Sequence, residues 1–433
     1  MTPPPQERPT TDAHIQRGSL RCLERLGRYI AIRLLKEVEK GQIVLAEPSG
    51  QLHFGEPDAA GELQATVTVR APRFYRKLLF GGSIGAAEAY MDGDWDCSAL
   101  AALIRILVRS RRAMLGMEKG WARFGYSLNK LMHLLRANTL RGSKHNIAAH
   151  YDLNNDFFAQ FLDATMTYSC AIFEHENASL EEASVAKLDR VCRKLALTPE
   201  DHVLEIGTGW GSFAIHAAQQ YGCRVTTATI SREQLELARS RIDAAGVGDR
   251  VTVLLKDYRE LEGRYQKIVS IEMIEAVGWE YLDGFFAKCS ELLAPDGTMA
   301  LQAITMADQE HERSKRSVDF IKRYIFPGGC VLSVTAMVDA LTRATDMRLV
   351  HLEDITPHYA KTLRMWRERF SANIEEVRAL GFDERFVRMW EFYLAYCEGG
   401  FMERLIGDVQ MVLAKPDWRR TPILGALPSC PGA

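Results

Sequence analysis

A glycine-rich turn is the first feature of this sequence that suggests chemistry. It reads Glu205-Ile-Gly-Thr-Gly-Trp-Gly211 and follows the short apolar run 202–206. Glycine tolerates positive φ angles and lets a ligand come close to the backbone. The last glycine arrives one residue too early for the dinucleotide pattern G-x-G-x-x-G, and no P-loop Lys-Ser/Thr pair follows it. The turn is therefore expected to hold neither a dinucleotide nor a nucleoside triphosphate.

Two further strand ends narrow the choice of cofactor. The second strand ends in Thr229-Ile-Ser-Arg-Glu-Gln234 rather than in an acid that could bind a ribose. The third leads into Asp257-Tyr258, a pair able to bind an adenine amino group and cover its ring. With the turn, these residues resemble the class I S-adenosylmethionine methyltransferases. Glu205 would then meet the cationic methionine end of the cofactor; the alternative is that it only caps the next helix.

The resemblance also places Tyr168-Ser169 beside the carboxylate and ribose of the cofactor, unless this segment merely tethers a loop. The residues expected to bind S-adenosylmethionine are Tyr168, Ser169, Glu205, Gly207, Thr208, Gly209, Gly211, Thr229, Ile230, Ser231, Gln234, Asp257 and Tyr258.

Strands alternate with helices from about residue 196 onward. The expected strands are 202–207, 224–230, 250–255, 267–271 and 298–304, and the expected helices are 212–221, 232–245 and 280–293. This alternation predicts βαβ units and a parallel, doubly wound sheet. Ligands of such sheets bind beyond the carboxyl ends of the strands, where the segments above would meet. We expect an α/β, Rossmann-like class I methyltransferase domain with a smaller N-terminal α+β domain.

Longer motifs resemble the cyclopropane fatty acid synthase family, whose members include enzymes acting on mycolic acids and on 10-methyl fatty acids. The resemblance covers roughly residues 140–415. Its most specific motifs are His150-Tyr-Asp-Leu-Asn-Asn-Asp-Phe157, Met166-Thr-Tyr-Ser-Cys-Ala171, Val269-Ser-Ile-Glu-Met-Ile-Glu-Ala-Val-Gly278, Lys322-Arg-Tyr-Ile-Phe-Pro-Gly-Gly329 and Phe392-Tyr-Leu-Ala-Tyr-Cys397.

This resemblance implies methyl transfer from S-adenosylmethionine to the double bond of an unsaturated acyl chain, usually on a phospholipid. Transfer leaves a carbocation, which aromatic faces can stabilise. A base then removes a proton from the new methyl group to close a cyclopropane ring. A hydride shift can instead give a methylene or methyl-branched product. In this family a bound bicarbonate is thought to be the base.

The residues that the resemblance assigns to the base site are only partly those of the family. Cys170, Glu275, Ile304 and Tyr359 match family positions, whereas Gln302 stands where the family has histidine. Glutamine can donate a hydrogen bond to an anion but cannot carry a positive charge. Olefin methylation is therefore supported more firmly than ring closure.

One cysteine has a weaker claim to a catalytic role. Cys397 matches a cysteine once proposed as the family nucleophile. The methyl transfer requires no covalent enzyme intermediate. We therefore favour the interpretation that Cys397 is a buried residue of the hydrophobic core. For Cys170, burial as a small core residue is an equally good alternative.

Composition excludes several classes of protein. The chain has 433 residues, of which 47% are hydrophobic and 25% are charged, so it is a globular protein of two or three domains. Nine cysteines without a C-x-x-C pair argue against a disulfide framework and a cysteine zinc site, and we expect no metal. A net charge of −2 argues against a nucleic-acid binder. No apolar run is long enough to span a membrane, and a cytoplasmic location is expected.

One segment is strongly basic. Between Arg105 and Lys144 the chain carries ten Lys or Arg and a single acid, Glu118, interleaved with apolar residues. Such a segment can hold a protein on the anionic inner face of a membrane, although a solvated helical face is the simpler interpretation. The expected layout is a disordered start at 1–12, the α+β domain at 13–104, the basic connector at 105–145, the methyltransferase domain at 146–416 and a tail at 417–433.

Two other functions are compatible with parts of this pattern. One is a methyltransferase for a soluble amine, which would need a polar acceptor pocket with a His or Glu base. The other is a non-catalytic lipid-binding protein that retains the fold. The favoured partner is an unsaturated acyl lipid, with peripheral contact to an anionic membrane, and a homodimer is a further expectation.

Overall fold

The computed structural model describes residues 11–110, 154–315 and 317–423, with side chains from Arg21 onward in the first helix. These residues form two compact units. One contains the N-terminal region together with residues 383–392, and the other contains the remainder of the chain. Most of the basic connector expected at 105–145, and His150, lie outside the described residues.

The first unit is an α+β fold built on a four-stranded sheet of order β2-β1-β3-β4. Strand β1 pairs with β2 as an antiparallel hairpin and with β3 in parallel. Ile43, Leu45 and Val67 alternate with more exposed residues and bury one face of the sheet. Its elements are α1 (Thr11–Leu35), β1 (Gly41–Glu47), β2 (Gly50–Glu56), β3 (Gln64–Val69), α2 (Arg73–Met91), β4 (Trp95–Cys97) and α3 (Leu100–Arg109).

Residues 383–392 complete this first unit. They include the start of α16 (Glu384–Met402), where the Arg388 guanidinium donates to the backbone oxygens of Tyr90 and Trp95. No pattern in the sequence predicted that this late segment packs with the N-terminal region.

The second unit is centred on a seven-stranded sheet of order β10-β11-β9-β8-β5-β6-β7. Strands β5 to β9 run parallel to one another, as expected. They are β5 (His202–Ile206), β6 (Arg224–Thr229), β7 (Val251–Leu255), β8 (Tyr265–Ile271) and β9 (Leu293–Met306), and the edge is formed by β10 (Arg348–Asp354) and β11 (Ile406–Ala414).

The expectation of a purely parallel sheet is wrong at this edge. Strand β11 pairs antiparallel with both β9 and β10, so the sheet is mixed. The chain enters β11 directly from α16, and no crossover helix carries it back to the other end of the sheet. An antiparallel edge on a parallel sheet is common in such folds.

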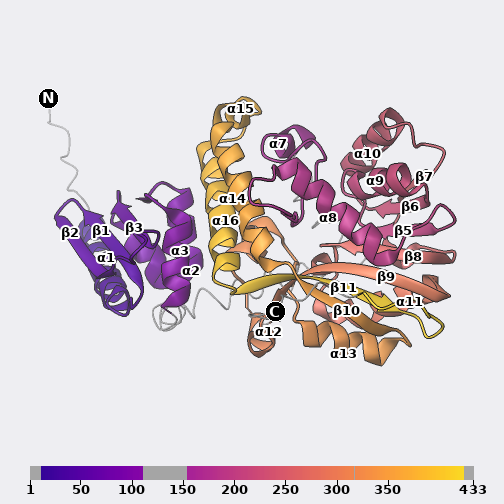
Figure 1. Ribbon diagram of the computed structural model, residues 1–433. Coiled ribbons are helices and arrows are strands. Elements are labelled where there is room, and N and C mark those ends of the chain that lie inside the picture. The colour runs from indigo at the N-terminus through magenta and orange to yellow at the C-terminus, as the bar shows by residue number, and fades with distance from the viewer. Residues whose placement is uncertain (1–10, 111–153, 316, 424–433) are drawn as a thin grey trace, which may run out of the picture. The chain divides into compact units, whose positions relative to one another are not determined.

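Helices cover both faces of the sheet (Figure 1). Apolar residues of α8 (Leu180–Leu195), α9 (Ser212–Tyr221) and α10 (Arg232–Ala244) bury one face. Those of α11 (Leu282–Leu292) and α13 (Val334–Ala344) bury the other. The remaining described helices are α7 (Asn155–Ala159), α12 (Asp308–Lys315), α14 (Thr356–Ala372) and α15 (Ile374–Ala379), with short turns η1 (Tyr258–Glu260), η2 (Ile274–Ala276), η3 (Trp279–Tyr281) and η4 (Ile321–Ile325).

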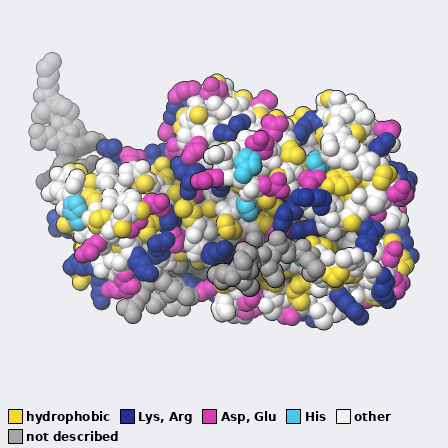
Figure 2. Space-filling view, viewed as in Figure 1, with side chains coloured by type: hydrophobic (Ala, Val, Ile, Leu, Met, Phe, Trp, Pro, Cys, Tyr) yellow, Lys and Arg dark blue, Asp and Glu magenta, His cyan; other side chains and the backbone are white. Residues whose placement is uncertain are grey.

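The described surface carries charges of both signs. In Figure 2, Lys and Arg side chains lie among Asp and Glu over the visible face. Among the helices that the structure describes, none is both long and apolar enough to cross a bilayer.

Candidate active site

The glycine-rich turn between β5 and α9 forms an open cradle. Gly207, Gly209 and Gly211 adopt φ angles of 103°, 52° and 88°, which side chains other than glycine rarely tolerate. A Cβ on Gly207 would approach the Cβ of Met273 to 3.1 Å. The turn is held by the backbone N–H groups of Gly207 and Thr208, both donating to the oxygen of Ala228. A ligand can therefore approach the backbone closely at this point.

Glu205 lies at the end of β5, directly before the cradle. Its side chain is buried, and Oε2 has no hydrogen-bond partner. Burial raises the pKa of Glu205 to about 8. A buried carboxylate oxygen without a donor fits the ammonium group of S-adenosylmethionine, which would supply the missing hydrogen bond. Glu205 does not cap α9, because the residue at that helix start is Gly211, without a side-chain cap.

The ends of β6 and β7 are ordered by their own side chains. Ser231 caps α10 by accepting from the N–H of Gln234, and the Thr229 hydroxyl donates to the Gln234 side chain. Asp257 forms a two-pronged ion pair with Arg259, at 2.7 and 2.8 Å. These contacts fix the loops around the carboxyl edge of the sheet, and Ile230 lies half-buried between them.

Tyr168 and Ser169 both have protein partners. The Tyr168 hydroxyl lies 2.8 Å from that of Tyr393, and the Ser169 hydroxyl accepts a 2.7 Å hydrogen bond from Lys187. Lys187 is a buried cation on α8.

Three of the residues expected to bind a free anion converge on a side chain that the sequence analysis did not single out. The backbone N–H of Cys170 and the Nε2 of Gln302 donate to Oε1 of Glu272, at 2.8 and 2.7 Å. The hydroxyl of Tyr359 donates to Oε2, at 2.6 Å. The half-buried Glu272 carboxylate therefore occupies a pocket of three donors.

Glu272 also has an unusual backbone. It follows β8 with a φ of 48°, in the left-handed region that favours glycine. The one feature of the sequence that could have drawn attention to Glu272 is the motif Glu272-Met-Ile-Glu275, in which it precedes the expected glutamate by three residues. Neither its backbone conformation nor its three donors could be inferred from that spacing.

Glu275 occupies a separate position. Its Oε1 accepts a hydrogen bond from the backbone N–H of Ile304, at 2.5 Å, while Oε2 is buried without a partner. Burial, and then the nearby Glu272, raise the pKa of Glu275 to about 8. The expected anion site is thus divided between two carboxyl groups. Ile304 donates to Glu275, whereas Cys170, Gln302 and Tyr359 donate to Glu272.

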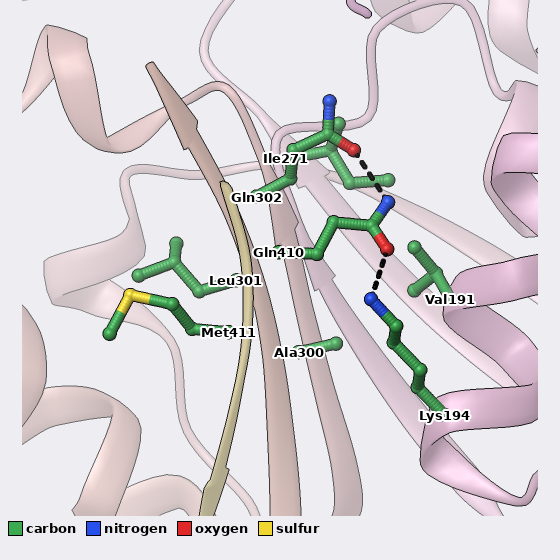
Figure 3. A pocket seen from close by; sticks show the side chains of 8 residues that line it. All are labelled: Val191, Lys194, Ile271, Ala300, Leu301, Gln302, Gln410 and Met411. Atoms are coloured by element: carbon green, nitrogen blue, oxygen red, sulfur yellow. Dashed lines mark hydrogen bonds between the residues drawn. The ribbon is translucent and has the colours of Figure 1, made fainter. Parts of the chain in front are cut away.

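A relay of amide groups fixes the orientation of Gln302 (Figure 3). Lys194 donates to Oε1 of Gln410 at 2.7 Å, and Nε2 of Gln410 donates to Oε1 of Gln302 at 3.0 Å. Because an ammonium can only donate, Lys194 sets the direction of both amides. Nε2 of Gln302 is left facing the carboxyl groups of Glu272 and Asp408. Val191, Ile271 and Ala300 lie beside this relay.

Asp408 adds a second acid to the same amide. Its side chain is fully buried and accepts from Gln302 at 3.0 Å, while Oδ1 has no partner. Burial, followed by the nearby Glu272, raises the pKa of Asp408 well above its usual range. Burial therefore favours the protonated form of Asp408.

The two cysteines behave as core residues. Burial raises the pKa of both thiols, Cys170 and Cys397, so neither is a thiolate at neutral pH. The Cys170 thiol donates to the backbone oxygen of Ala171, and only its N–H faces Glu272. Neither cysteine forms a disulfide within the described residues.

Aromatic rings adjoin the carboxylate pocket. The Tyr359 ring stacks on Phe401 with centroids 4.3 Å apart, and its edge meets Trp366. Trp366 also packs on Tyr168, which lies against Phe158. This wall offers π faces to a developing positive charge.

Comparison with known proteins identifies the family. Residues 138–411 match the model of mycolic acid cyclopropane synthetase. This chain belongs to that family. A tuberculostearic acid methyltransferase of Mycobacterium tuberculosis is 41% identical over 351 residues, covering 78% of this chain and 81% of the relative. The cyclopropane-fatty-acyl-phospholipid synthase of Escherichia coli K12 is 36% identical, covering 82% of this chain and 89% of the relative.

Solved structures agree with this family assignment. Mycolic acid cyclopropane synthase CmaA1 complexed with SAH and CTAB is 34% identical, with a TM-score of 0.59 over 63% of this chain and 98% of that one. Coclaurine N-methyltransferase, at 21% identity, shares the fold alone. This chain is accordingly an S-adenosylmethionine-dependent methyltransferase that modifies fatty acyl chains.

Proposed function

We propose that this enzyme methylates the double bond of an unsaturated acyl chain carried on a phospholipid and closes a cyclopropane ring. The observation that carries this proposal is the convergence of Cys170, Gln302 and Tyr359 on one carboxylate beside an aromatic wall. Alkene methylation needs this pairing, because aromatic faces stabilise the cation and an anion removes the proton. The phospholipid substrate is supported by the name of the Escherichia coli relative.

The cofactor supplies an electrophilic methyl group. Glu205 would bind the ammonium group of the cofactor, and Asp257 with Tyr258 would face its adenine. The glycine-rich turn would let the cofactor approach the protein backbone closely. The chain's own residues then exclude water and place an anion near the new methyl group. Cys170 and Tyr359 orient that anion through hydrogen bonds, and neither exchanges a covalent bond with the substrate.

A methylene or methyl-branched product is the second candidate. It is favoured by the tuberculostearic acid methyltransferase relative, which is 41% identical. Both outcomes begin with the same methyl transfer. A hydride shift before proton loss gives the methylene product, and its conversion to a saturated methyl branch needs a separate hydride donor.

The test uses purified enzyme, oleoyl phospholipid vesicles and S-adenosylmethionine carrying a trideuterated methyl group. We expect label in the acyl fraction with two of the three deuterons retained, because one leaves as a proton. Cyclopropane signals in the proton spectrum support ring closure, whereas terminal-methylene signals support the second candidate. Labelling of small amines with an unlabelled acyl fraction contradicts both.

A further inference from the structure

The donor pocket around Glu272 is already filled by the protein. Both oxygens of its carboxylate accept hydrogen bonds, from two donors at Oε1 and one at Oε2. A free carboxylate-like anion needs the same three donors and would have to displace this side chain. By contrast, Glu275 and Asp408 each leave one buried oxygen without a partner.

The backbone conformation of Glu272 supports a functional role. A residue other than glycine at φ 48° is strained. The surrounding contacts hold the residue there, and its N–H donates to the backbone oxygen of Gln302 at 2.9 Å. Such strain persists where it places a side chain at a specific point. Here it turns the carboxylate into the pocket formed by Cys170 and Tyr359.

Accessibility separates Glu272 from Asp408 but not from Glu275, which is also half-buried and accepts only one hydrogen bond. Asp408 is fully buried, so it cannot touch a substrate, whereas Glu272 is half-buried. Burial raises the pKa of both Asp408 and Glu275, which favours their neutral forms. Burial lowers the pKa of Lys187, while the nearby Glu272 acts in the opposite direction. Glu272 is thus the one carboxylate of these three that combines a full set of donors with partial exposure.

We propose that Glu272 is the built-in base of this enzyme and takes the place of a free anion such as bicarbonate. This inference rests on the proposed function. The π electrons of the alkene form a bond to the methyl carbon while the C–S bond pair stays on sulfur. Glu272 then takes a proton from that methyl group, and the released C–H pair closes the ring. The proton remains on Glu272 as a carboxylic acid until product leaves and water accepts it.

Two substitutions test this proposal in opposite ways. Glu272→Gln fills the pocket without a base, so we expect turnover to fall at least about a hundredfold, with no rescue by added bicarbonate. Glu272→Gly empties the pocket and suits the positive φ, so we expect the same loss in carbonate-free buffer and recovery when bicarbonate is added. Wild-type turnover should not depend on bicarbonate. Glu280→Gln, at an exposed carboxylate nearby, is the matched control and should behave as wild type.

A binding measurement separates this proposal from the proposed function. Carbon-13 NMR of labelled bicarbonate should show exchange broadening with Glu272→Gly and none with wild type, whether or not methyl transfer occurs. Calorimetry with S-adenosylmethionine and circular dichroism check that each variant is folded. A wild-type enzyme that needs bicarbonate, an active Glu272→Gln, or bicarbonate binding to wild type would overturn the built-in base. Failure of every form to methylate lipid, with the NMR result as expected, would instead overturn the acyl substrate.

Discussion

Glu275 and Glu272 are only three residues apart, yet their surroundings differ. Glu275 accepts from the Ile304 N–H and has a buried, unpartnered oxygen, whereas Glu272 accepts at both oxygens. We expect Glu275→Gln to lower turnover about tenfold or more while changing the dissociation constant for S-adenosylmethionine by less than about twofold. The reason is that Glu275 borders the carboxylate pocket rather than the glycine cradle. Steady-state kinetics and calorimetry check this; equal losses in turnover and affinity would contradict it.

Two buried carboxyl groups should make the stability of the protein depend on pH. Burial raises the pKa values of Glu205 and Glu275 from 4.5 to about 8. Between these values the folded state binds more protons than the unfolded state. The contribution of these two groups to stability is therefore greatest below about pH 4.5 and falls as pH rises towards 8. At about 1.4 kcal/mol for each pKa unit, we expect their contribution to the free energy of unfolding to fall by several kcal/mol across this window.

Many other groups titrate in the same range, so the comparison must be made against a variant. The double substitution Glu205→Gln and Glu275→Gln should flatten the pH dependence relative to wild type, measured by urea unfolding without cofactor. An equally steep decline in the double variant would show that other groups cause it.

The sequence indicated that several residues of the site lie together, but not which group they surround. Gln302, Tyr359 and Cys170 were assigned to one anion site, and the structure brings all three to a single carboxylate. That carboxylate belongs to Glu272, because a backbone turn at φ 48° directs its side chain inward. Such a turn depends on tertiary contacts, which no local pattern reveals.

At the scale of elements, helix α8 links the protein surface to the site. Lys187, Arg190 and Lys194 lie on it at helical spacing. Lys194 donates both to Glu353 and to Gln410, so it anchors the amide relay, whereas Arg190 pairs with Glu353 alone. The two cations therefore share a partner but differ in their connection to Gln302.

This difference defines a matched pair of substitutions. Lys194→Met removes the donor that orients Gln410, so both amides can turn and Gln302 presents an oxygen to Glu272. We expect turnover to fall about tenfold, equivalent to about 1.4 kcal/mol, with affinity for S-adenosylmethionine unchanged. Lys194→Arg should restore most of the activity, and Arg190→Met should match wild type. Comparable losses in Lys194→Met and Arg190→Met would assign the effect to Glu353 instead.

The predicted elements were most accurate where hydrophobic periodicity was strong. Helix α9 spans the expected residues 212–221, and strands β5 to β8 lie within two residues of their predicted bounds. Strands β10 and β11 were not predicted. Their antiparallel pairing at the edge of the sheet depends on where α14 and α16 return the chain, and this is a property of the packed fold rather than of the strand sequences.

At the scale of the whole molecule, access to a lipid substrate is the remaining physical requirement. The face shown in Figure 2 mixes charges of both signs, so that face offers no explanation by itself for attraction to an anionic bilayer. The ten Lys and Arg between residues 105 and 144 do offer one, although most of that segment lies outside the described residues. We propose that these charges hold the enzyme at anionic membranes by electrostatic attraction.

Attraction of this kind is screened by salt, because the Debye length falls from about 10 Å at 0.1 M to about 3 Å at 1 M. Co-sedimentation with vesicles rich in phosphatidylglycerol should therefore weaken steeply as salt rises, and neutral vesicles should bind little protein. The triple substitution Arg111→Glu, Arg112→Glu and Lys119→Glu should weaken binding at low salt. A control with the same change of charge is available at the exposed Arg224, Arg264 and Arg348, which lie near the amino ends of strands. If both triple variants lose binding equally, net charge rather than the basic segment governs association, and salt-independent binding would point to insertion of apolar side chains.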